Sequence, residues 1–347
     1  MAEYREIQGT AVQSLASNTG TIKGQIWYDN VNGAFKLESV TTVEAWASGG
    51  NRNNGITSQP GGGGTATDTL SFGGAQPPSN PAPIPSGGSG YSALSESYDG
   101  SAWTVTNPLN NGRSGIVAFG ASSASSIAAN GYADSPGGVF YLNSTEGFDG
   151  SSWTNLNNSN TNKEGATGSG IQNAGFACTG AQPHGAGNEG TANETWDGTC
   201  WTTANATTFA TQRAGSAGTL GAAVIAGGQS GYPQSYLSTA AEWDGTCWSS
   251  ATSLPGTRAG MSKTRSPQVA AVMFGGYAGS ATPLFRNLNY DGAAWTTGAT
   301  MARPGADGAG ASGDSSGLIA AGGGNYITTT EEYLGAGAPV TQTLTTT

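Results

Sequence analysis

Positive charge is scarce in this sequence. Lysine and arginine together number 12 among 347 residues, against 22 aspartates and glutamates, and the formal net charge is −10 at pH 7. The basic residues form no cluster. Because nucleic-acid binding depends on neutralising phosphates with lysine and arginine, the sequence predicts that nucleic acid is not a partner.

Histidine, cysteine and long apolar runs are also scarce. The one histidine, His184, lies in a glycine-rich segment, and Cys178, Cys200 and Cys247 form no CxxC pair. Metal sites combine several such ligands, so we expect no metal and no cofactor. No run reaches the roughly 18 apolar residues of a membrane span, and the first residues lack the pattern of a secretory signal. We therefore expect a protein made in a reducing cytoplasm, with no membrane partner.

Glycine and aromatic residues are abundant instead. There are 58 glycines, 9 tryptophans, 12 tyrosines and 9 phenylalanines. This aromatic content is too high for a disordered chain. Many short strands joined by many tight turns would account for it, which is typical of all-β sandwiches, barrels and propellers.

Six tryptophans recur at a nearly constant spacing. The intervals are 57, 50, 48, 47 and 47 residues, between Trp46, Trp103, Trp153, Trp201, Trp248 and Trp295. Each is followed, 26 or 27 residues later, by a glycine pair or its variant at the end of a small apolar segment such as GAAVIAGG. Most of the tryptophans also close the pattern aromatic-Asp-Gly-x-x-Trp. A repeat of this length is typical of a propeller blade.

Each repeat is expected to contain four antiparallel strands, here called a to d. Strand a follows a basic residue, strand b is the apolar segment, strand c holds the aromatic residue before Asp-Gly, and strand d holds the tryptophan. Asp-Gly between two strands favours a type I′ turn, which we expect between strands c and d. Cys200 and Cys247 occupy equivalent places in adjacent repeats, too far apart for a disulfide. We interpret them as small packing residues on strand d.

An apolar strand ending in Gly-Gly, followed by an aromatic residue and a tryptophan, resembles the Kelch repeat. The last repeat has a strand c at Glu331 to Tyr333 with no tryptophan after it, whereas Trp46 has no strand c before it. We therefore predict an all-β, six-bladed Kelch-like β-propeller over residues 43–335. Its two ends would share one blade, which removes exposed sheet edges.

Charged residues recur with the repeat. Arginines precede strand a and glutamates precede the aromatic residue of strand c; they are Arg113, Arg213, Arg258 and Arg303, and Glu96, Glu146, Glu194 and Glu242. Lys163 replaces arginine in one repeat. A residue repeated in each blade is scaffold rather than part of an asymmetric catalytic site. We therefore predict buried ion pairs between neighbouring units and no catalytic residue.

The two ends of the chain lie outside the repeat. Residues 1–42 contain GQIWYDNVNGAFKLES, which predicts an arm with a β-hairpin that turns at Asn32-Gly33. Residues 336–347 are a tail, either an added strand or loose. The hairpin, with phrases such as YDGSAWT, resembles virion structural proteins of tailed phages, especially those of marine cyanobacteria.

This resemblance implies a non-enzymatic component of the virion, on the tail or a tail appendage, with other virion proteins as partners. Such a protein is assembled in the host cytoplasm and can take part in host attachment. We expect the arm to dock to the particle, with Trp27, Tyr28 and Phe35 as interaction residues.

Two other functions stay open. Variable loops on a fixed scaffold often carry recognition, and Tyr91, Tyr132, Phe140 and Tyr141 between strands b and c would stack on a host-surface glycan. A polysaccharide-degrading enzyme is the third hypothesis, because carboxylate pairs can assemble across blades. A single histidine cannot build the copper site of a galactose-oxidase-type enzyme, and the Asp-box of sialidases is absent.

Overall fold

The computed structural model divides the chain into two compact units. The arm comprises Met1–Glu44 and Leu334–Thr347, and the propeller comprises Ala45–Tyr333. The C-terminal tail therefore belongs to the same unit as the N-terminal hairpin. The structure describes residues 13–15, 26–40, 43–57, 61–75, 91–135, 138–183, 189–231, 233, 235–279, 282–302, 310–314, 316–321, 326–336 and 339–344.

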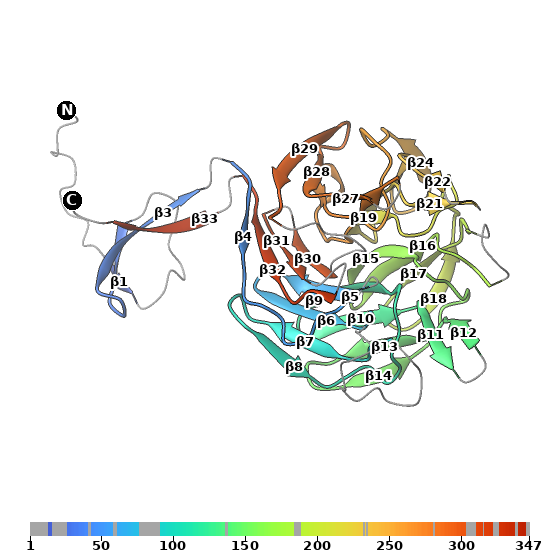
Figure 1. The fold of residues 1–347 in the computed structure, drawn as a ribbon, viewed down its shortest axis with the longest axis horizontal. Helices are drawn as coiled ribbons and strands as arrows, with labels where there is room; N and C mark the ends of the chain where they lie inside the picture. The colour runs from blue at the N-terminus through green and yellow to red at the C-terminus, as the bar shows by residue number, and fades with distance from the viewer. Residues whose placement is uncertain are drawn as a thin grey trace. The chain divides into compact units, whose positions relative to one another are not determined.

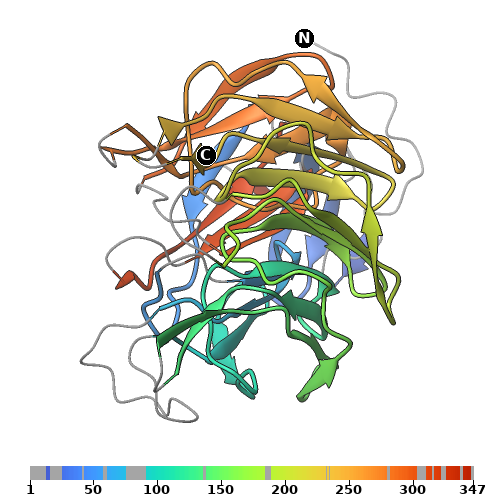
Figure 2. The same ribbon diagram turned by 90° about the vertical axis from the view of Figure 1, so that its right-hand side faces the viewer.

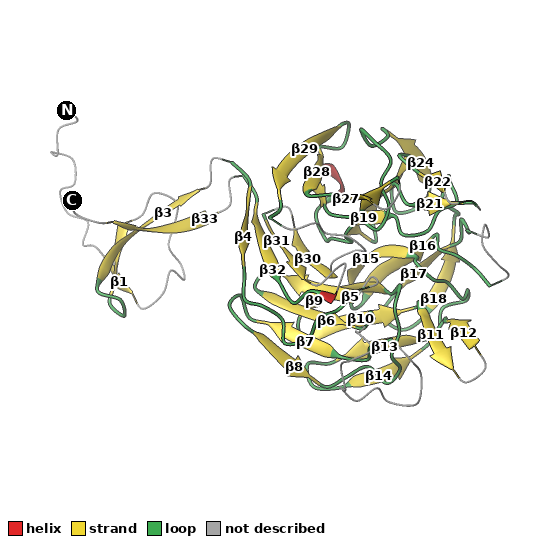
Figure 3. Ribbon diagram, viewed as in Figure 1, coloured by secondary structure: helices red, strands yellow, loops and turns green. Residues whose placement is uncertain are grey.

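The blades of the propeller are antiparallel sheets arranged around an axis (Figure 1). Within the described residues, five sheets have four strands and one has three. From strand a to strand d, the first blade has β5 (Gly61–Thr65), β6 (Asp68–Phe72), β7 (Ser95–Tyr98) and β8 (Trp103–Thr106), and the second has β9 (Val117–Ser122), β10 (Ser125–Ala129), β13 (Thr145–Phe148) and β14 (Trp153–Leu156). The third has β15 (Thr167–Ile171), β16 (Ala174–Cys178), β17 (Asn193–Trp196) and β18 (Trp201–Ala204), and the fourth has β19 (Gly215–Thr219), β20 (Ala222–Ala226), β23 (Ala240–Trp243) and β24 (Trp248–Ala251). The fifth has β25 (Ala271–Met273), β28 (Arg286–Tyr290) and β29 (Trp295–Thr300), and the sixth has β30 (Gly310–Asp314), β31 (Gly317–Ala321), β32 (Thr330–Leu334) and β4 (Ala45–Ser48). Strands dominate the regular structure (Figure 3).

The sixth blade is completed by the N-terminal end of the propeller. β4 is the outer strand of the sheet that otherwise comes from β30, β31 and β32. Beyond β4, the N–H of Gly49 donates to the carbonyl of Thr330 at 3.0 Å, and that of Arg52 donates to Thr328 at 2.8 Å. The predicted closure of the ring by both chain ends is confirmed.

The repeated tryptophans join consecutive blades. The indole Nε1 of Trp153 donates to Ser95 Oγ of the preceding blade at 3.1 Å, and that of Trp201 donates to Thr145 Oγ1 at 2.9 Å. Trp103 makes the same bond to Thr330 across the closure, at 2.9 Å. Each of these three tryptophans therefore buries a large ring between two sheets while its polar edge finds a partner. Seen from the side, successive sheets stack face against face (Figure 2).

The turn between strands c and d differs from the expected type I′ turn. Four residues, Asp99 to Ala102, connect β7 to β8, and only Gly100 among them has a positive φ, +93°. Asp99 Oδ1 accepts hydrogen bonds from the N–H groups of Ser101 and Ala102, both at 2.8 Å. The aspartate therefore closes a wider loop with its side chain. The same bonds recur at Asp149, Asp197, Asp244 and Asp291.

The predicted packing role of two cysteines is wrong. Cys200 and Cys247 are exposed and lie in these loops, directly before strand d. The N–H of each donates to the loop aspartate at 2.7 Å. Cys178, in contrast, is buried at the end of β16.

The loop aspartates predict a loss of stability in acid. The backbone N–H groups of Ser152 and Ser151 lower the pKa of Asp149 to about 2, and backbone N–H groups lower the pKa of Asp197, Asp244 and Asp291 in the same way. Folded pKa values below the unfolded value of 3.8 stabilise the fold above about pH 4, and this contribution is lost as the pH falls towards 2. Urea midpoints measured from pH 6 to pH 2 are expected to fall in that window. Asp149→Asn, which keeps an acceptor but cannot titrate, is expected to show a shallower fall; an unchanged slope would contradict this cause.

The fifth blade has an irregular innermost segment. Ser262 and Thr264 bond to Ser216 of β19 in the fourth blade, with the Ser216 N–H donating to Ser262 at 3.3 Å and the Thr264 N–H donating to Ser216 at 2.8 Å. One residue later, the N–H of Arg265 donates to Gly313 of β30 in the sixth blade at 3.0 Å. The segment keeps bonds to its own blade, where the Ser262 N–H donates to Phe274 at 3.0 Å and Thr264 Oγ1 donates to Val272 at 3.1 Å, and it also bridges the two neighbouring blades. Lys263 and Arg265 extend from this segment towards the inner strands β5, β9 and β15, into the space that we call the axial channel.

The arm is a separate small sheet. β2 (Ile26–Asp29) and β3 (Ala34–Val40) form the predicted hairpin, with Gly33 in its loop at a φ of +67°. β33 (Pro339–Leu344), from the C-terminal tail, pairs antiparallel with β3, and β1 (Gln13–Leu15) pairs parallel with β2. The tail is therefore an added strand.

Candidate functional site

One end of the propeller collects the segments that lead into each blade. Among the described residues, the segments of five blades each form an isolated bridge to the start of the connection between strands b and c of the same blade. The bridges are Thr57 to Ala75, Ser114 to Tyr132, Glu164 to Ala181, Gln212 to Gln229, and Ala259 to Tyr277. Because strand a follows directly, these bridges surround the axis. We call this end the axial mouth.

A chain of backbone hydrogen bonds connects consecutive blades at the axial mouth. The N–H of Gly165 donates to Gly115 at 3.2 Å, that of Arg213 to Gly165 at 2.6 Å, and that of Gly260 to Arg213 at 2.8 Å. The three glycines have φ values of +63°, +61° and +67°, and Arg213 has +57°. Three blades therefore place glycine where the fourth places arginine in a conformation that costs an L-residue about 1–2 kcal/mol.

The repeat position predicted for Arg213 is wrong. In the equivalent backbone bonds, the carbonyls of Arg113, Lys163 and Arg258 accept from Gly74, Gly131 and Gly228. In the fourth blade the acceptor of this bond is Thr211, two residues before Arg213. Arg213 is thus not one of the repeated arginines, and Arg303 lies outside the described residues. Because Arg113, Arg258 and Arg213 are all arginines, the sequence did not show that Arg213 lies two residues later in its repeat.

Arg213 joins a polar group at the axial mouth. Its Nη2 lies 3.4 Å from Glu164 Oε1, and its Nη1 donates to the hydroxyl of Tyr277 at 3.3 Å. That hydroxyl donates to Gln229 Oε1 at 3.3 Å. The side chain of Arg213 is 32% exposed and that of Glu164 is 11% exposed. We call Glu164, Arg213, Gln229 and Tyr277 the mouth cluster. In it, the guanidinium of Arg213 is partly exposed, whereas the side chains of Gln229 and Tyr277 are buried.

Gln229 has an unmet hydrogen-bonding requirement. The residue is 1% exposed, and within the described parts of the chain no hydrogen-bond acceptor lies within reach of its Nε2. Nearly all buried polar side-chain atoms in folded proteins have a partner. An acceptor from outside the described residues would meet this requirement.

Two tyrosines, Tyr236 and Tyr141, flank the mouth cluster. The Tyr236 ring meets the Tyr277 ring edge-on, with centroids 5.6 Å apart. Elsewhere at the axial mouth, Tyr91 and Tyr132 contact each other at 4.6 Å between centroids and share a hydrogen bond between their hydroxyls. Burial raises the pKa of Tyr141, and the negative charge of Glu164 raises it further. Tyr141 thus lies within electrostatic reach of the mouth cluster.

The predicted glycan residues occupy this same end. β11 (Tyr132–Ser135) and β12 (Gly138–Tyr141) form a two-stranded ribbon in the second blade. Tyr91, Tyr132 and Tyr141 are half-buried, whereas Phe140 on the same ribbon is 49% exposed. The structure therefore places three of the four residues half-buried at the axial mouth, and Tyr141 among them lies within electrostatic reach of the mouth cluster. Whether any of them binds a glycan stays a prediction.

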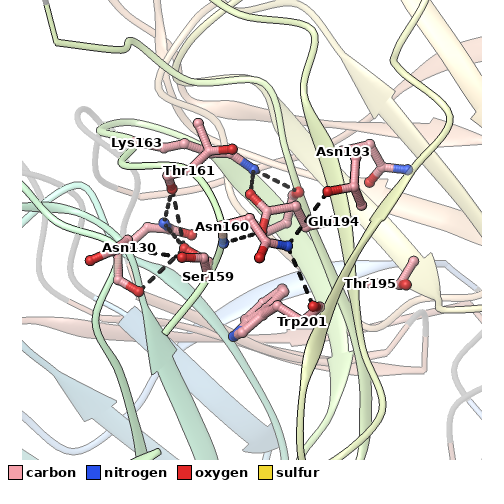
Figure 4. Close-up of polar contacts among 12 residues, drawn as sticks. Asn130, Ser159, Asn160, Thr161, Lys163, Asn193, Glu194, Thr195 and Trp201 are labelled. Carbon is pink, nitrogen blue, oxygen red and sulfur yellow. Dashed lines mark hydrogen bonds and ion pairs between the residues drawn. The ribbon is translucent and has the colours of Figure 1, made fainter. Parts of the chain in front are cut away.

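Buried ion pairs lie deeper in the blades. Arg113 pairs with Glu146, and both side chains are fully buried. Lys163 Nζ lies 3.0 Å from Glu194 Oε1, and the N–H of Asn160 donates to the other oxygen of Glu194 at 2.6 Å (Figure 4). A third pair joins Arg52, which the sequence analysis missed, to Glu96 at 3.6 Å. Each pair ties the segment leading into a blade to strand c of the same blade, rather than joining neighbouring units.

Two of the expected charged residues lack this arrangement. Glu242 lies one residue closer to the aromatic residue than the other glutamates and accepts from the hydroxyl of Tyr290 at 3.0 Å. Arg258 donates to the carbonyl of Arg286 at 2.9 Å, and burial lowers its pKa to about 10. Leu288 occupies the glutamate position in that blade. The charge pattern therefore changes from blade to blade.

The axial channel contains two cationic side chains. Nη1 of Arg265 donates to the carbonyls of Gly64, Gly120 and Ala121 at 3.1–3.2 Å. Lys263 Nζ donates to the carbonyl of Ile116 at 2.8 Å, and burial lowers its pKa to about 8. A cavity between the glycine-rich inner strands and these two residues measures about 10 Å³, the room of a single water. Lys263 and Arg265 therefore line this cavity together with the inner strands.

Comparison with known proteins shows the fold. No family model matches the sequence, and no curated protein is similar to it. A solved structure described as "Structure of YjhT" matches 84% of this chain and 99% of its own, with a TM-score of 0.65 and 12% identity. The propeller unit is a six-bladed β-propeller. At this identity the likeness extends to the fold alone.

In the described ranges, no three residues among histidine, cysteine, aspartate and glutamate gather as they would around a metal ion. His184 lies outside those ranges. Among the described residues, no helix has the length and the hydropathy to cross a membrane.

Several residues of the axial mouth were not identified from the sequence. Glu164, Gln229, Tyr277 and Lys263 carry no local motif, and the topology alone brings them together. One usable signal exists for Arg213, because aligning the repeats on glycine rather than on arginine shows that it replaces a glycine.

Proposed function

We propose that the protein is a non-enzymatic component of a tailed-phage particle, on the tail or a tail appendage. In this proposal the arm docks to other virion proteins and the propeller presents the axial mouth for host attachment. The separate sheet of the arm is the observation that carries the proposal. The arm combines strands from both ends of the chain. The propeller ring is closed by β4, which is not part of the arm.

The hairpin of the arm has one partly exposed apolar face. Ile26 and Leu37 lie opposite each other, as do Tyr28 and Phe35, so the four share a face. Ile26 is 45% and Phe35 is 48% exposed, and the rings of Tyr28 and Phe35 are in contact. Exposed apolar patches of this kind often mark interaction sites.

Trp27 does not belong to this face. It lies opposite Lys36 on the other side of the hairpin and is only 3% exposed. A structural role for Trp27 follows, and the docking proposal rests on its neighbours Tyr28 and Phe35.

A substitution on the apolar face tests the docking proposal. Phe35→Glu is expected to lower incorporation into purified phage particles by roughly 30-fold, because burying a phenylalanine contributes about 2 kcal/mol. Circular dichroism and thermal melting of the purified protein should remain unchanged. Val31→Glu is the matched control, since Val31 is 69% exposed in the hairpin loop. Normal incorporation of Phe35→Glu would refute docking through this face.

A further inference from the structure

The position of Arg213 is unexplained by the stability of the propeller. A left-handed backbone at a non-glycine residue persists where the surroundings impose it, and such residues gather at binding sites. Gly115, Gly165 and Gly260 show that the same backbone hydrogen bonds form without an arginine. The fourth blade therefore has a strained backbone at Arg213, and this residue places a guanidinium in the axial mouth.

The hydrogen-bonding groups around Arg213 alternate in kind. Arg213 donates, Glu164 accepts, and the hydroxyl of Tyr277 both accepts from Arg213 and donates to Gln229. Gln229, which is 1% exposed, supports this network from below, and its Nε2 has no acceptor within the described residues. A sugar hydroxyl is itself both donor and acceptor, so neighbouring hydroxyls match alternating partners of this kind.

The charges around Arg213 and the tyrosines beside the mouth cluster restrict the chemical class of the ligand. Glu164 and Arg213 lie 3.4 Å apart, so the charge of the guanidinium is largely balanced. A second carboxylate lies nearby, where Glu189 accepts from Gln212 Nε2 at 3.1 Å and from the N–H of Gly231 at 3.1 Å. Lys263, whose charge interacts with those of Glu164 and Arg213, brings two cations against these two carboxylates. The site therefore has no excess positive charge to attract an acidic ligand. Aromatic side chains with a polar edge, such as the flanking tyrosines, provide apolar area beside hydrogen-bonding groups.

We propose that the mouth cluster, Glu164, Arg213, Gln229 and Tyr277, binds a neutral saccharide unit, with the flanking tyrosines against its apolar face. This rests on the proposed attachment function, for which it names the ligand class. Arg213 and Glu164 contact the sugar hydroxyls, and Gln229 and Tyr277 hold Arg213 in place from below.

The test compares two substitutions that relieve the same backbone strain. Arg213→Gly restores the glycine of the other blades and removes the guanidinium. Thr179→Gly is the matched control: Thr179 has a φ of +60° where other blades have Gly73, Gly227 and Gly275, and it lies outside the mouth cluster. Both variants are expected to melt at or above the temperature of the unchanged protein.

Binding is measured with the full chain on an array of immobilised glycans. The array carries neutral glycans ending in glucose, galactose, mannose or N-acetylglucosamine, and acidic glycans. The unchanged protein and Thr179→Gly are expected to bind neutral glycans equally. Arg213→Gly should lose at least about 10-fold in affinity, since a hydrogen bond to a charged group contributes on the order of 1.5–3 kcal/mol. Glu164→Gln should also weaken binding.

Three results would overturn the proposal: no binding to the array, binding of acidic glycans alone, or equal binding by Arg213→Gly and the unchanged protein. These results leave the particle assay with Phe35→Glu untouched. Failure of the saccharide site and failure of the proposed virion role can therefore be told apart.

Discussion

Replacing Arg113 by alanine is expected to lower the free energy of unfolding by about 3–5 kcal/mol, because removing one partner of a buried ion pair leaves the other charge uncompensated. Arg113 and Glu146 are both fully buried. Among the described residues, Glu146 would keep the N–H of Asn110, at 2.7 Å, as its one hydrogen-bond partner. The carbonyl of Ser144 would also lose the donor Nη1 of Arg113, now at 2.9 Å. Urea unfolding monitored by tryptophan fluorescence measures the change.

A double variant separates the cost of the unpaired charge from the cost of lost packing. Arg113→Met with Glu146→Gln removes both charges, while the glutamine can still accept from Asn110. It is expected to recover at least half of the stability that Arg113→Ala loses, since neutral replacements of buried pairs are well tolerated. A double variant no more stable than Arg113→Ala would contradict this account.

Arg113 and Arg213 illustrate what the sequence could and could not predict. Both precede an alanine- or glycine-rich strand, and residue type alone groups them together. In the structure, Arg113 lies in a buried ion pair, whereas Arg213 lies two residues later in the repeat and is partly open to solvent. We therefore expect opposite outcomes, with large destabilisation on removal of Arg113 and none on replacement of Arg213 by glycine.

The blade count and the ring closure could be predicted because each repeat solves the same packing problem. A tryptophan on strand d must reach the neighbouring sheet, which fixes its spacing from blade to blade. The c–d loop was predicted wrongly because Asp-Gly is compatible with two loop lengths. The side-chain bonds of Asp99 to Ser101 and Ala102 select the longer one.

The mouth cluster could not be predicted because its members come from three different blades. Glu164 leads into the third blade, Arg213 and Gln229 belong to the fourth, and Tyr277 belongs to the fifth. Their proximity depends on the ring of blades, which a local motif does not encode. The pairing of β33 with β3 was equally out of reach, since two strands nearly a chain length apart carry no signal for each other.

The closing strand is the second place where a large effect is expected. Trp46 on β4 is half-buried, and its ring lies 4.9 Å from Phe274 and 5.1 Å from Tyr333, between centroids. Its Nε1 donates to Asn287 Oδ1 at 3.3 Å. Trp46→Ala is expected to lower the free energy of unfolding by about 2 kcal/mol, somewhat less than a fully buried tryptophan would.

The consequence of Trp46→Ala differs from that of the same substitution inside the ring. β4 joins the sixth blade by pairing with β32, and no hairpin connects these two strands. If this pairing is weakened, the edge of β32 is exposed. An open sheet edge can pair with other chains. Size-exclusion chromatography is expected to show concentration-dependent association of Trp46→Ala, and limited proteolysis should cut faster on the N-terminal side of β4. Trp295→Ala is the matched control, because Trp295 occupies the same repeat position, is also half-buried and lies on β29, which its own blade holds by a continuous hairpin with β28. That variant should be destabilised without associating. If both variants stay monomeric and resist protease equally, closure by β4 does not protect the edge of the sixth blade.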